Sequence, residues 1–258
     1  MSTPTAAELR AVCHPAGLLD RRSGEHWAGR LYMRRISLQL TRHLVGTRIT
    51  PNQLTYLMIV AGVGAGAVLA LPGLAGPLLA AILIQVYLLL DCVDGEVARW
   101  RRQTSVTGVY LDRVGHYLSE AALLVGAGLH ASDVAGDGRL GGWAFLGAIA
   151  ALGAILIKSE TDLVDVSRAR SGLPPVQDSA SVPRSSGAAT ARKVAASLKF
   201  HRLVGGVEAS LLLLAAGLLD AWHGDLVFSR VAVAVLAAVA VLQTVLHLAS
   251  ILLSSRLK

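Results

Sequence analysis

Residues 91–116 read DCVDGEVARWRRQTSVTGVYLDRVGH and place ionisable side chains between two strongly apolar segments. Among them are the aspartates Asp91, Asp94 and Asp112 and the histidine His116. Ionisable groups are costly inside a bilayer unless they are paired or functional, so an acidic cluster within apolar sequence indicates a site.

The spacing of these residues places them on two helical faces. Asp91 and Asp94 are three residues apart at the end of one apolar run. Asp112, His116 and Glu120 recur every four residues at the start of the next run, and both spacings keep side chains on one face of a helix. If residues 99–107 form a short turn, the two helices are antiparallel neighbours and their acidic faces lie opposite each other.

Carboxylates that converge from two helices repel each other unless a cation lies between them. Mg²⁺ or Mn²⁺ is the expected cation, because hard cations take oxygen ligands and commonly bridge phosphates. Gly95 and Gly108 remove side chains at the two places where a bulky ligand would approach the backbone.

The pattern D-x-x-D-G-x-x-A-R, eight residues, G-x-x-x-D-x-x-x-H resembles the signature of the CDP-alcohol phosphotransferases, also called CDP-alcohol phosphatidyltransferases. Members of this family move a substituted phosphate from a CDP-alcohol to an acceptor hydroxyl and release CMP. Seven of the eight signature positions match, and at the eighth the family has an aspartate. The eight residues are Asp91, Asp94, Gly95, Ala98, Arg99, Gly108, Asp112 and His116.

The resemblance implies roles for these residues. Asp91, Asp94 and Asp112 would hold the Mg²⁺ or Mn²⁺, and Asp112 would share the catalytic step with His116. A pocket for the cytidine and phosphates of the donor would be lined by Gly95, Ala98, Arg99 and Gly108. A homodimer is implied by the resemblance alone.

His116 is the departure from the family, in which an aspartate at this position is thought to deprotonate the acceptor hydroxyl. Imidazole is a poor ligand for Mg²⁺ but a good base near neutral pH, since its unperturbed pKa is about 6.5. We therefore interpret His116 as the catalytic base, oriented by Glu120 one turn deeper on the same face. The alternative is a histidine that is merely hydrogen-bonded in a site that has lost turnover.

The composition indicates a membrane protein. The chain has 258 residues, of which 53% are hydrophobic and 16% charged. Its formal charge of +7 is accompanied by only 5% aromatic residues, and the basic residues flank apolar runs. Contact with membrane lipids explains this charge better than nucleic-acid binding. Cys13 and Cys92 lie in such different surroundings that we expect no disulfide between them.

Six apolar stretches approach the roughly 20 residues that a membrane-spanning helix needs. They are residues 54–71, 74–97, 106–130, 140–157, 203–222 and 231–253. The predicted fold is an all-α integral membrane protein with six transmembrane helices. We expect two parts, a cytoplasmic N-terminal region (1–53) and a six-helix membrane domain (54–258), and no signal peptide in residues 1–25.

The N-terminal region contains a predicted amphipathic helix at residues 27–45. Its apolar positions Met33, Ile36, Leu40 and Leu44 are three or four residues apart, and arginines fill much of the remainder. This pattern favours a helix that lies in the membrane interface and precedes the six transmembrane helices. The alternative is a plain linker beside the membrane.

The basic residues orient the predicted helices. If the N-terminus is cytoplasmic, almost every Lys and Arg falls on the cytoplasmic side, as the positive-inside rule requires. The acidic cluster and the C-terminus then also face the cytoplasm of a cell membrane. Basic residues that follow the fourth apolar stretch have two interpretations. They are either a positive-inside flank or a binding site for the acceptor, which could be a phosphorylated polyol. The candidates for such a site are Lys158, Arg192, Lys193 and Arg202.

Three functions are to be considered for this sequence. The first is the metal-dependent transferase, acting in the synthesis of phospholipids or of related glycolipids and polyol phosphates. The second is an altered or inactive relative that binds a CDP-alcohol or lipid without turnover. The third, a small transporter, is disfavoured because the acids gather at one end of the helices and the chain has no repeat. The donor alcohol and the acceptor are not identified by the sequence.

Overall fold

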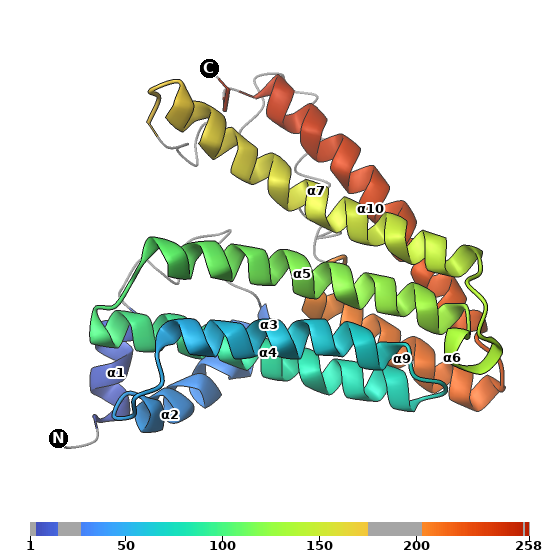
Figure 1. Cartoon of the computed structure of the whole chain (residues 1–258), viewed down its shortest axis with the longest axis horizontal. Helices are drawn as coiled ribbons and strands as arrows, with labels where there is room; N and C mark the ends of the chain where they lie inside the picture. The colour runs from blue at the N-terminus through green and yellow to red at the C-terminus, as the bar shows by residue number, and fades with distance from the viewer. Residues whose placement is uncertain (1–3, 15–26, 175–202, 255, 258) are drawn as a thin grey trace. The chain divides into compact units, whose positions relative to one another are not determined.

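The structure is a computed structural model that describes residues 4–14, 27–174, 203–254 and 256–257. Every regular element in these ranges is a helix, as Figure 1 shows. The predicted all-α class is therefore confirmed for the described part of the chain.

Four of the helices are long and apolar enough to cross a membrane. They are α3 (Pro51–Leu69), α4 (Ala75–Arg101), α7 (Gly142–Arg170) and α10 (Val227–Leu253). Helices α5 (Val106–Ala131) and α9 (Gly206–His223) occupy the other two predicted spans but do not meet the same criterion. Both interrupt their apolar sequence with ionisable residues, so six transmembrane helices remain a prediction.

One helix end differs from the sequence prediction. Helix α4 continues to Arg101, past the predicted end of its apolar stretch at residue 97, whereas α7 continues to Arg170 as the charged helical extension that the sequence predicts for residues 158–170. A helix keeps its backbone hydrogen bonds when it leaves an apolar environment, so the change in composition does not end it. At the end of α4 this extension carries Arg99 on the helix instead of in the turn.

The chain forms two compact units. The first contains the described residues of Met1–Gly64 and Ile82–Ser119, and the second those of Ala65–Ala81 and Glu120–Lys258. Helices α3, α4 and α5 contribute residues to both units.

The first unit begins with α1 (Ala6–Cys13), the short π-helix η1 (Gly29–Met33) and α2 (Arg34–Leu44). A capping box between Thr5 and Glu8 begins α1, with each side chain bonded to the other residue's backbone N–H. Leu9, Cys13 and Leu38 form a buried cluster that joins α1 to α2. A second cluster of Leu54, Val93 and Val97 joins α3 to α4.

Helical residues cover the predicted N-terminal segment, and most of its apolar stripe packs inward. Met33 is buried, and Leu40 and Leu44 pack against the cluster of Leu54, Val93 and Val97, whereas Ile36 is 49% exposed. The packed face also includes Ser37 and Thr41, because their hydroxyls donate hydrogen bonds to a buried carboxylate of α4, described below. Its location in the membrane interface remains a prediction.

Glycine permits the close approach of α3 and α5 within the first unit. A Cβ atom on Gly62 would lie 2.0 Å from the hydroxyl oxygen of Ser119, a distance that no side chain can occupy. A Cβ atom on Gly115 would similarly lie 2.5 Å from the terminal methyl of Met58. This contact holds the N-terminal part of α5 against α3.

The second unit is built on α7, α9 and α10, with the short α6 (Val134–Asp137). Helices α7 and α10 run side by side (Figure 1), and Thr161 and His247 share a hydrogen bond of 3.0 Å between them. The carboxylate of Asp220 accepts hydrogen bonds from the backbone N–H groups of Phe228 and Ser229, which begins α10.

Candidate active site

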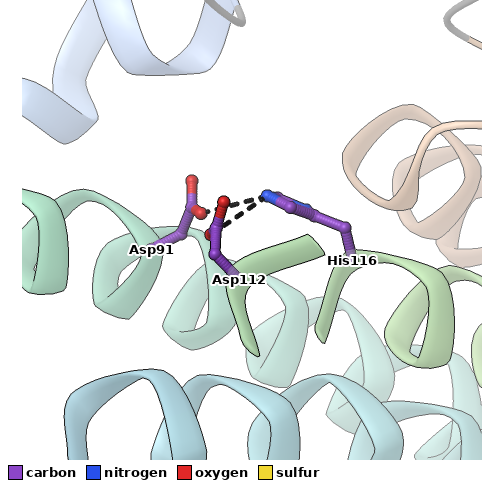
Figure 2. Close-up of side chains that lie close together, drawn as sticks. All are labelled: Asp91, Asp112 and His116. Carbon is purple, nitrogen blue, oxygen red and sulfur yellow. Dashed lines mark ion pairs between the residues drawn. The ribbon is translucent and has the colours of Figure 1, made fainter. Parts of the chain in front are cut away.

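Three of the predicted site residues converge in the first unit. Asp91 comes from α4, and Asp112 and His116 come from α5 (Figure 2). Nε2 of His116 lies 3.3 Å from Oδ1 of Asp91 and 3.6 Å from Oδ1 of Asp112. One possible ligand atom from each residue lies within 4.8 Å of the other two.

The turn between α4 and α5 brings these faces together. It spans residues 102–105, shorter than predicted, and Arg102 takes the left-handed conformation with φ of 55°. Ser105 begins α5, because its hydroxyl oxygen accepts a 3.0 Å hydrogen bond from the backbone N–H of Gly108. A turn this short makes the two helices antiparallel neighbours, as expected from the spacing.

Asp94 lines the cavity that is described below, but it lies outside the group formed by Asp91, Asp112 and His116. Its Oδ2 atom accepts a hydrogen bond of 2.6 Å from the hydroxyl of Thr55 on α3, and both residues are buried. The structure therefore gathers two of the three predicted metal ligands with the predicted base, and gives the third aspartate a protein partner. Thr55 was missed from the sequence, although a hydroxyl within an apolar helix is a signal that can be sought.

His116 has a second partner on α4. The hydroxyl of Tyr87 forms a hydrogen bond with Nδ1 of His116, and the two rings meet edge to face with centroids 5.8 Å apart. Glu120, the residue expected to orient the imidazole, lies 2.8 Å from the ammonium group of Lys158. This geometry assigns the orienting contact to Tyr87, which the sequence did not reveal because it lies 29 residues from His116.

A cavity of about 310 Å³ contains the three aspartates. Its walls include all four residues predicted to surround the donor: Gly95, Ala98, Arg99 and Gly108. A Cβ atom on Gly108 would lie 3.2 Å from Oδ1 of Asn52, another lining residue. Asn52 and Arg34 were not singled out from the sequence as site residues, and they add an amide and a second guanidinium to the walls.

The donor atoms of the cluster fit a divalent cation. Two carboxylates supply the hard oxygen ligands that Mg²⁺ and Mn²⁺ prefer, and the imidazole supplies a nitrogen better suited to other metals. These three residues therefore do not select one metal. In a phosphate-binding site the remaining ligands come from substrate and water, and these ligands also influence which metal binds.

The residues predicted to bind the acceptor are placed only in part. Lys158 is on α7 and forms the ion pair with Glu120, both in the second unit. Arg192, Lys193 and Arg202 lie outside the described residues. An acceptor site at these positions remains a prediction.

Comparisons with known proteins find a family model and two relatives that resemble part of this chain. Residues 48–157 match the sequence model described as CDP-alcohol phosphatidyltransferase. A protein of Thermococcus kodakarensis named "Bifunctional IPC transferase and DIPP synthase" is 32% identical over 143 residues, which are 54% of this chain and 30% of that protein. A protein of Aquifex aeolicus with the same name is 35% identical over 107 residues, 42% of this chain and 24% of that protein.

The matches thus cover less than a third of the length of these relatives. The range matched by the family model contains the whole of the acidic motif. The segment from residue 48 to residue 157, which carries Asp91, Asp94, Asp112 and His116, matches the CDP-alcohol phosphatidyltransferase model and makes up less than half of the chain.

Proposed function

We propose that this protein is a membrane enzyme that transfers a substituted phosphate from a CDP-alcohol to an acceptor hydroxyl and releases CMP. The donor is CDP-diacylglycerol or a related CDP-linked alcohol, and the acceptor class includes phosphorylated polyols. One observation carries this proposal. The seven motif residues that match the family signature, from two helices, line a single cavity, and two of its aspartates, Asp91 and Asp112, converge with His116.

Asp91 and Asp112 are the residues that would hold Mg²⁺ or Mn²⁺, with Asp94 beside them in the cavity. A divalent cation bound there supplies charge neutralisation for the phosphate oxygens and for the CMP leaving group. Thr55 keeps the carboxylate of Asp94 oriented through its 2.6 Å hydrogen bond. Gly95 and Gly108 leave room for the nucleotide against the backbone.

The acceptor is activated at His116. The hydroxyl oxygen of the acceptor forms a bond to the β-phosphorus of the donor, and the bond from that phosphorus to the CMP oxygen breaks. The hydroxyl proton passes to the imidazole of His116. When Nδ1–H donates to the hydroxyl oxygen of Tyr87, Nε2 carries the lone pair and faces Asp91 and Asp112. This tautomer is the one that can accept a proton at the cluster.

The same geometry supports a second candidate function. A protonated His116 would place a positive charge 3.3 Å from Asp91 and 3.6 Å from Asp112, where it would neutralise the carboxylates without a metal. A protein held in this state would bind a CDP-alcohol or lipid without turnover. The two functions differ in whether CMP is released.

The proposed enzyme lies in the cell membrane with six transmembrane helices. The basic residues support an orientation with the termini and the cavity on the cytoplasmic side. The four apolar helices of sufficient length support membrane insertion, and a homodimer is proposed from the family resemblance.

The proposal is tested by CMP release from the purified full-length protein. CDP-diacylglycerol and water-soluble CDP-alcohols are crossed with phosphorylated polyols in the presence of Mg²⁺ or Mn²⁺. We expect CMP release with at least one pair of substrates. Binding of CDP-alcohols without CMP release under any acceptor would instead select the second candidate function.

A further inference from the structure

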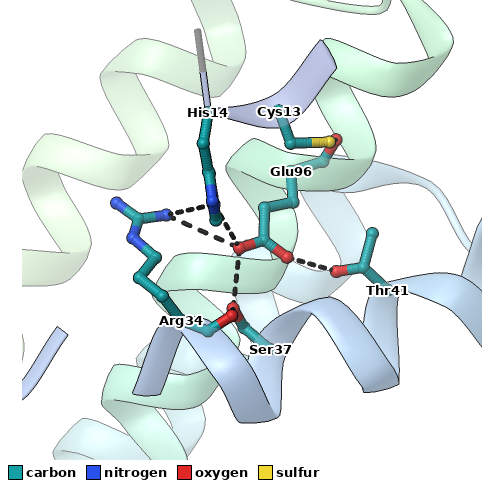
Figure 3. Close-up of polar contacts among 6 residues, drawn as sticks. All are labelled: Cys13, His14, Arg34, Ser37, Thr41 and Glu96. Carbon is teal, nitrogen blue, oxygen red and sulfur yellow. Dashed lines mark hydrogen bonds and ion pairs between the residues drawn. The ribbon is translucent and has the colours of Figure 1, made fainter. Parts of the chain in front are cut away.

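Glu96 is an acidic residue that the proposed reaction does not use. It lies on α4 between Asp94 and Ala98, and it is fully buried. Figure 3 shows its side chain among residues of α1, of His14 just after α1, and of α2. These described residues are called the N-terminal segment below. A buried carboxylate at this place needs partners, because an unpaired charge in an apolar environment is strongly destabilising.

Four side chains of the N-terminal segment supply these partners. The hydroxyl of Ser37 donates to Oε1 at 2.6 Å, and the hydroxyl of Thr41 donates to Oε2 at 2.7 Å. Nε2 of His14 lies 3.0 Å from Oε1, and Nη1 of Arg34 forms an ion pair with the same oxygen at 3.5 Å. One carboxylate thus joins the end of α1 and successive turns of α2 to α4.

Besides its ion pair with Glu96, Arg34 also lines the cavity of the proposed donor site. Its side chain is 24% exposed and lines the cavity that holds Asp91, Asp94 and Asp112. Arg99 lines the same cavity, and its Nε atom is buried and without a hydrogen-bond partner in the described part of the chain. Two guanidinium groups in one cavity, one with an unpaired donor, suit an anion with several oxygens, such as the diphosphate of a nucleotide.

We propose that Arg34 binds the phosphates of the donor and that Glu96 is the positioning residue that holds Arg34 at the cavity. This inference rests on the proposed function for the identity of the anion. It extends the site to a residue that precedes the segment matched by the family, which begins at residue 48. The N-terminal segment is then part of the donor site.

Cys13 reports whether the N-terminal segment is docked. Its side chain is buried, and its thiol donates a hydrogen bond of 3.3 Å to the backbone carbonyl of Glu96. Undocking would expose this thiol to an alkylating reagent. Cys92 is the other cysteine of the chain, so a Cys92→Ala background leaves Cys13 as the single reporter.

The experiment measures two properties in the full chain with Mg²⁺ present. The first is the Kd of CDP, CMP and cytidine, and the second is the rate of alkylation of Cys13 by N-ethylmaleimide. The variants are Arg34→Gln, Arg34→Lys and Glu96→Gln. Arg35→Gln is the matched control, because it removes the same charge from the neighbouring exposed residue of α2.

We expect Arg34→Gln to weaken CDP binding by roughly ten- to a hundredfold, as for loss of a hydrogen bond to a charged group, and to leave cytidine binding unchanged. Glu96→Gln should weaken CDP binding and speed the alkylation of Cys13, whereas Arg35→Gln should change neither. Unchanged CDP binding in Arg34→Gln, or an equal loss for CDP and cytidine, would overturn the inference.

If Arg34→Gln also speeds the alkylation of Cys13, Arg34→Lys decides, because lysine keeps the charge but not the planar fork. The inference is supported if Arg34→Lys binds CDP more weakly than wild type, binds cytidine as wild type does, and keeps the slow alkylation of Cys13. Any other pattern in Arg34→Lys overturns it. Failure of the wild-type protein to bind CDP or CMP would overturn the proposed function itself. A wild-type protein that binds both, with an Arg34→Gln variant that binds them equally well, would overturn only the role of Arg34.

Discussion

The hydroxyl of Thr55 on α3 donates a hydrogen bond to Oδ2 of Asp94 on α4, with 2.6 Å between the two oxygens. Both residues are buried, so the contact orients a carboxylate that bulk water does not reach freely. It joins the first two long helices at the floor of the proposed donor site.

Replacing Thr55 with valine should lower both stability and CMP release. Valine keeps the shape of threonine but removes the donor, and a buried carboxylate oxygen without its partner costs about 1–3 kcal/mol. Thr55→Ser keeps the hydroxyl and should stay close to wild type. Thermal unfolding in detergent and initial rates of CMP release measure the two effects, and equal values for Thr55→Val and Thr55→Ser would contradict the role of the hydrogen bond.

Gly62 and Gly64 on α3 should respond differently to alanine. A Cβ atom on Gly62 would lie 2.0 Å from the hydroxyl oxygen of Ser119, whereas one on Gly64 would lie 3.8 Å from a methyl of Leu83. Gly62→Ala should therefore cost about 1–3 kcal/mol through overpacking, and Gly64→Ala should be tolerated. Thermal unfolding of the two variants decides, and equal stability would show that α3 and α5 are not in this close contact.

His116 should be replaceable by aspartate but not by alanine. A positioned base contributes roughly 10²–10⁴-fold to a rate, so His116→Ala should lose about this factor in CMP release. His116→Asp introduces the residue that the family resemblance implies at this position, and it should retain most of the rate. Initial rates with an intact CDP-alcohol and acceptor test this, and an alanine variant as fast as wild type would show that His116 is not the base.

Cys13 should react slowly with alkylating reagents until the solution is strongly alkaline. Burial first, and then the nearby charge of Glu96, raise the pKa of the Cys13 thiol from its ordinary value of 9.0 to about 11. A raised folded-state pKa gives a stabilising contribution that is full below pH 9.0 and declines as the pH rises toward about 11. Alkylation rates at several pH values measure this in the Cys92→Ala background, and a normal thiol rate at pH 8 would contradict the burial.

The site was largely predictable because its chemistry is local in sequence. Asp91 and Asp112 are fixed to their helical faces by spacings of three and four, and the short turn leaves only an antiparallel arrangement. Gly95, Ala98, Arg99 and Gly108, which the family resemblance implied as donor-binding residues, lie on the same two helices and line the cavity.

The partners of these residues were not predictable, because they come from distant parts of the chain. Thr55 reaches Asp94 across 39 residues, and Tyr87 reaches His116 across 29. Glu96 provides the clearest case. Periodicity marks it only as a polar position of α4, and its role depends on an N-terminal segment that no spacing rule connects to it. Tertiary contacts of this kind also add the polar residues Ser37 and Thr41 to the packed face of α2.

We propose that Asp91 and Asp112 hold the divalent cation that CMP release requires, beside His116 as the base. The most direct measurement is CMP release by EDTA-treated protein as Mg²⁺ or Mn²⁺ is added back, for wild type, Asp91→Asn and the exposed control Asp165→Asn on α7. We expect no CMP without metal, recovery in wild type and Asp165→Asn, and no recovery in Asp91→Asn at any metal concentration. CMP release without metal, or recovery of Asp91→Asn to the wild-type rate, would contradict the proposal.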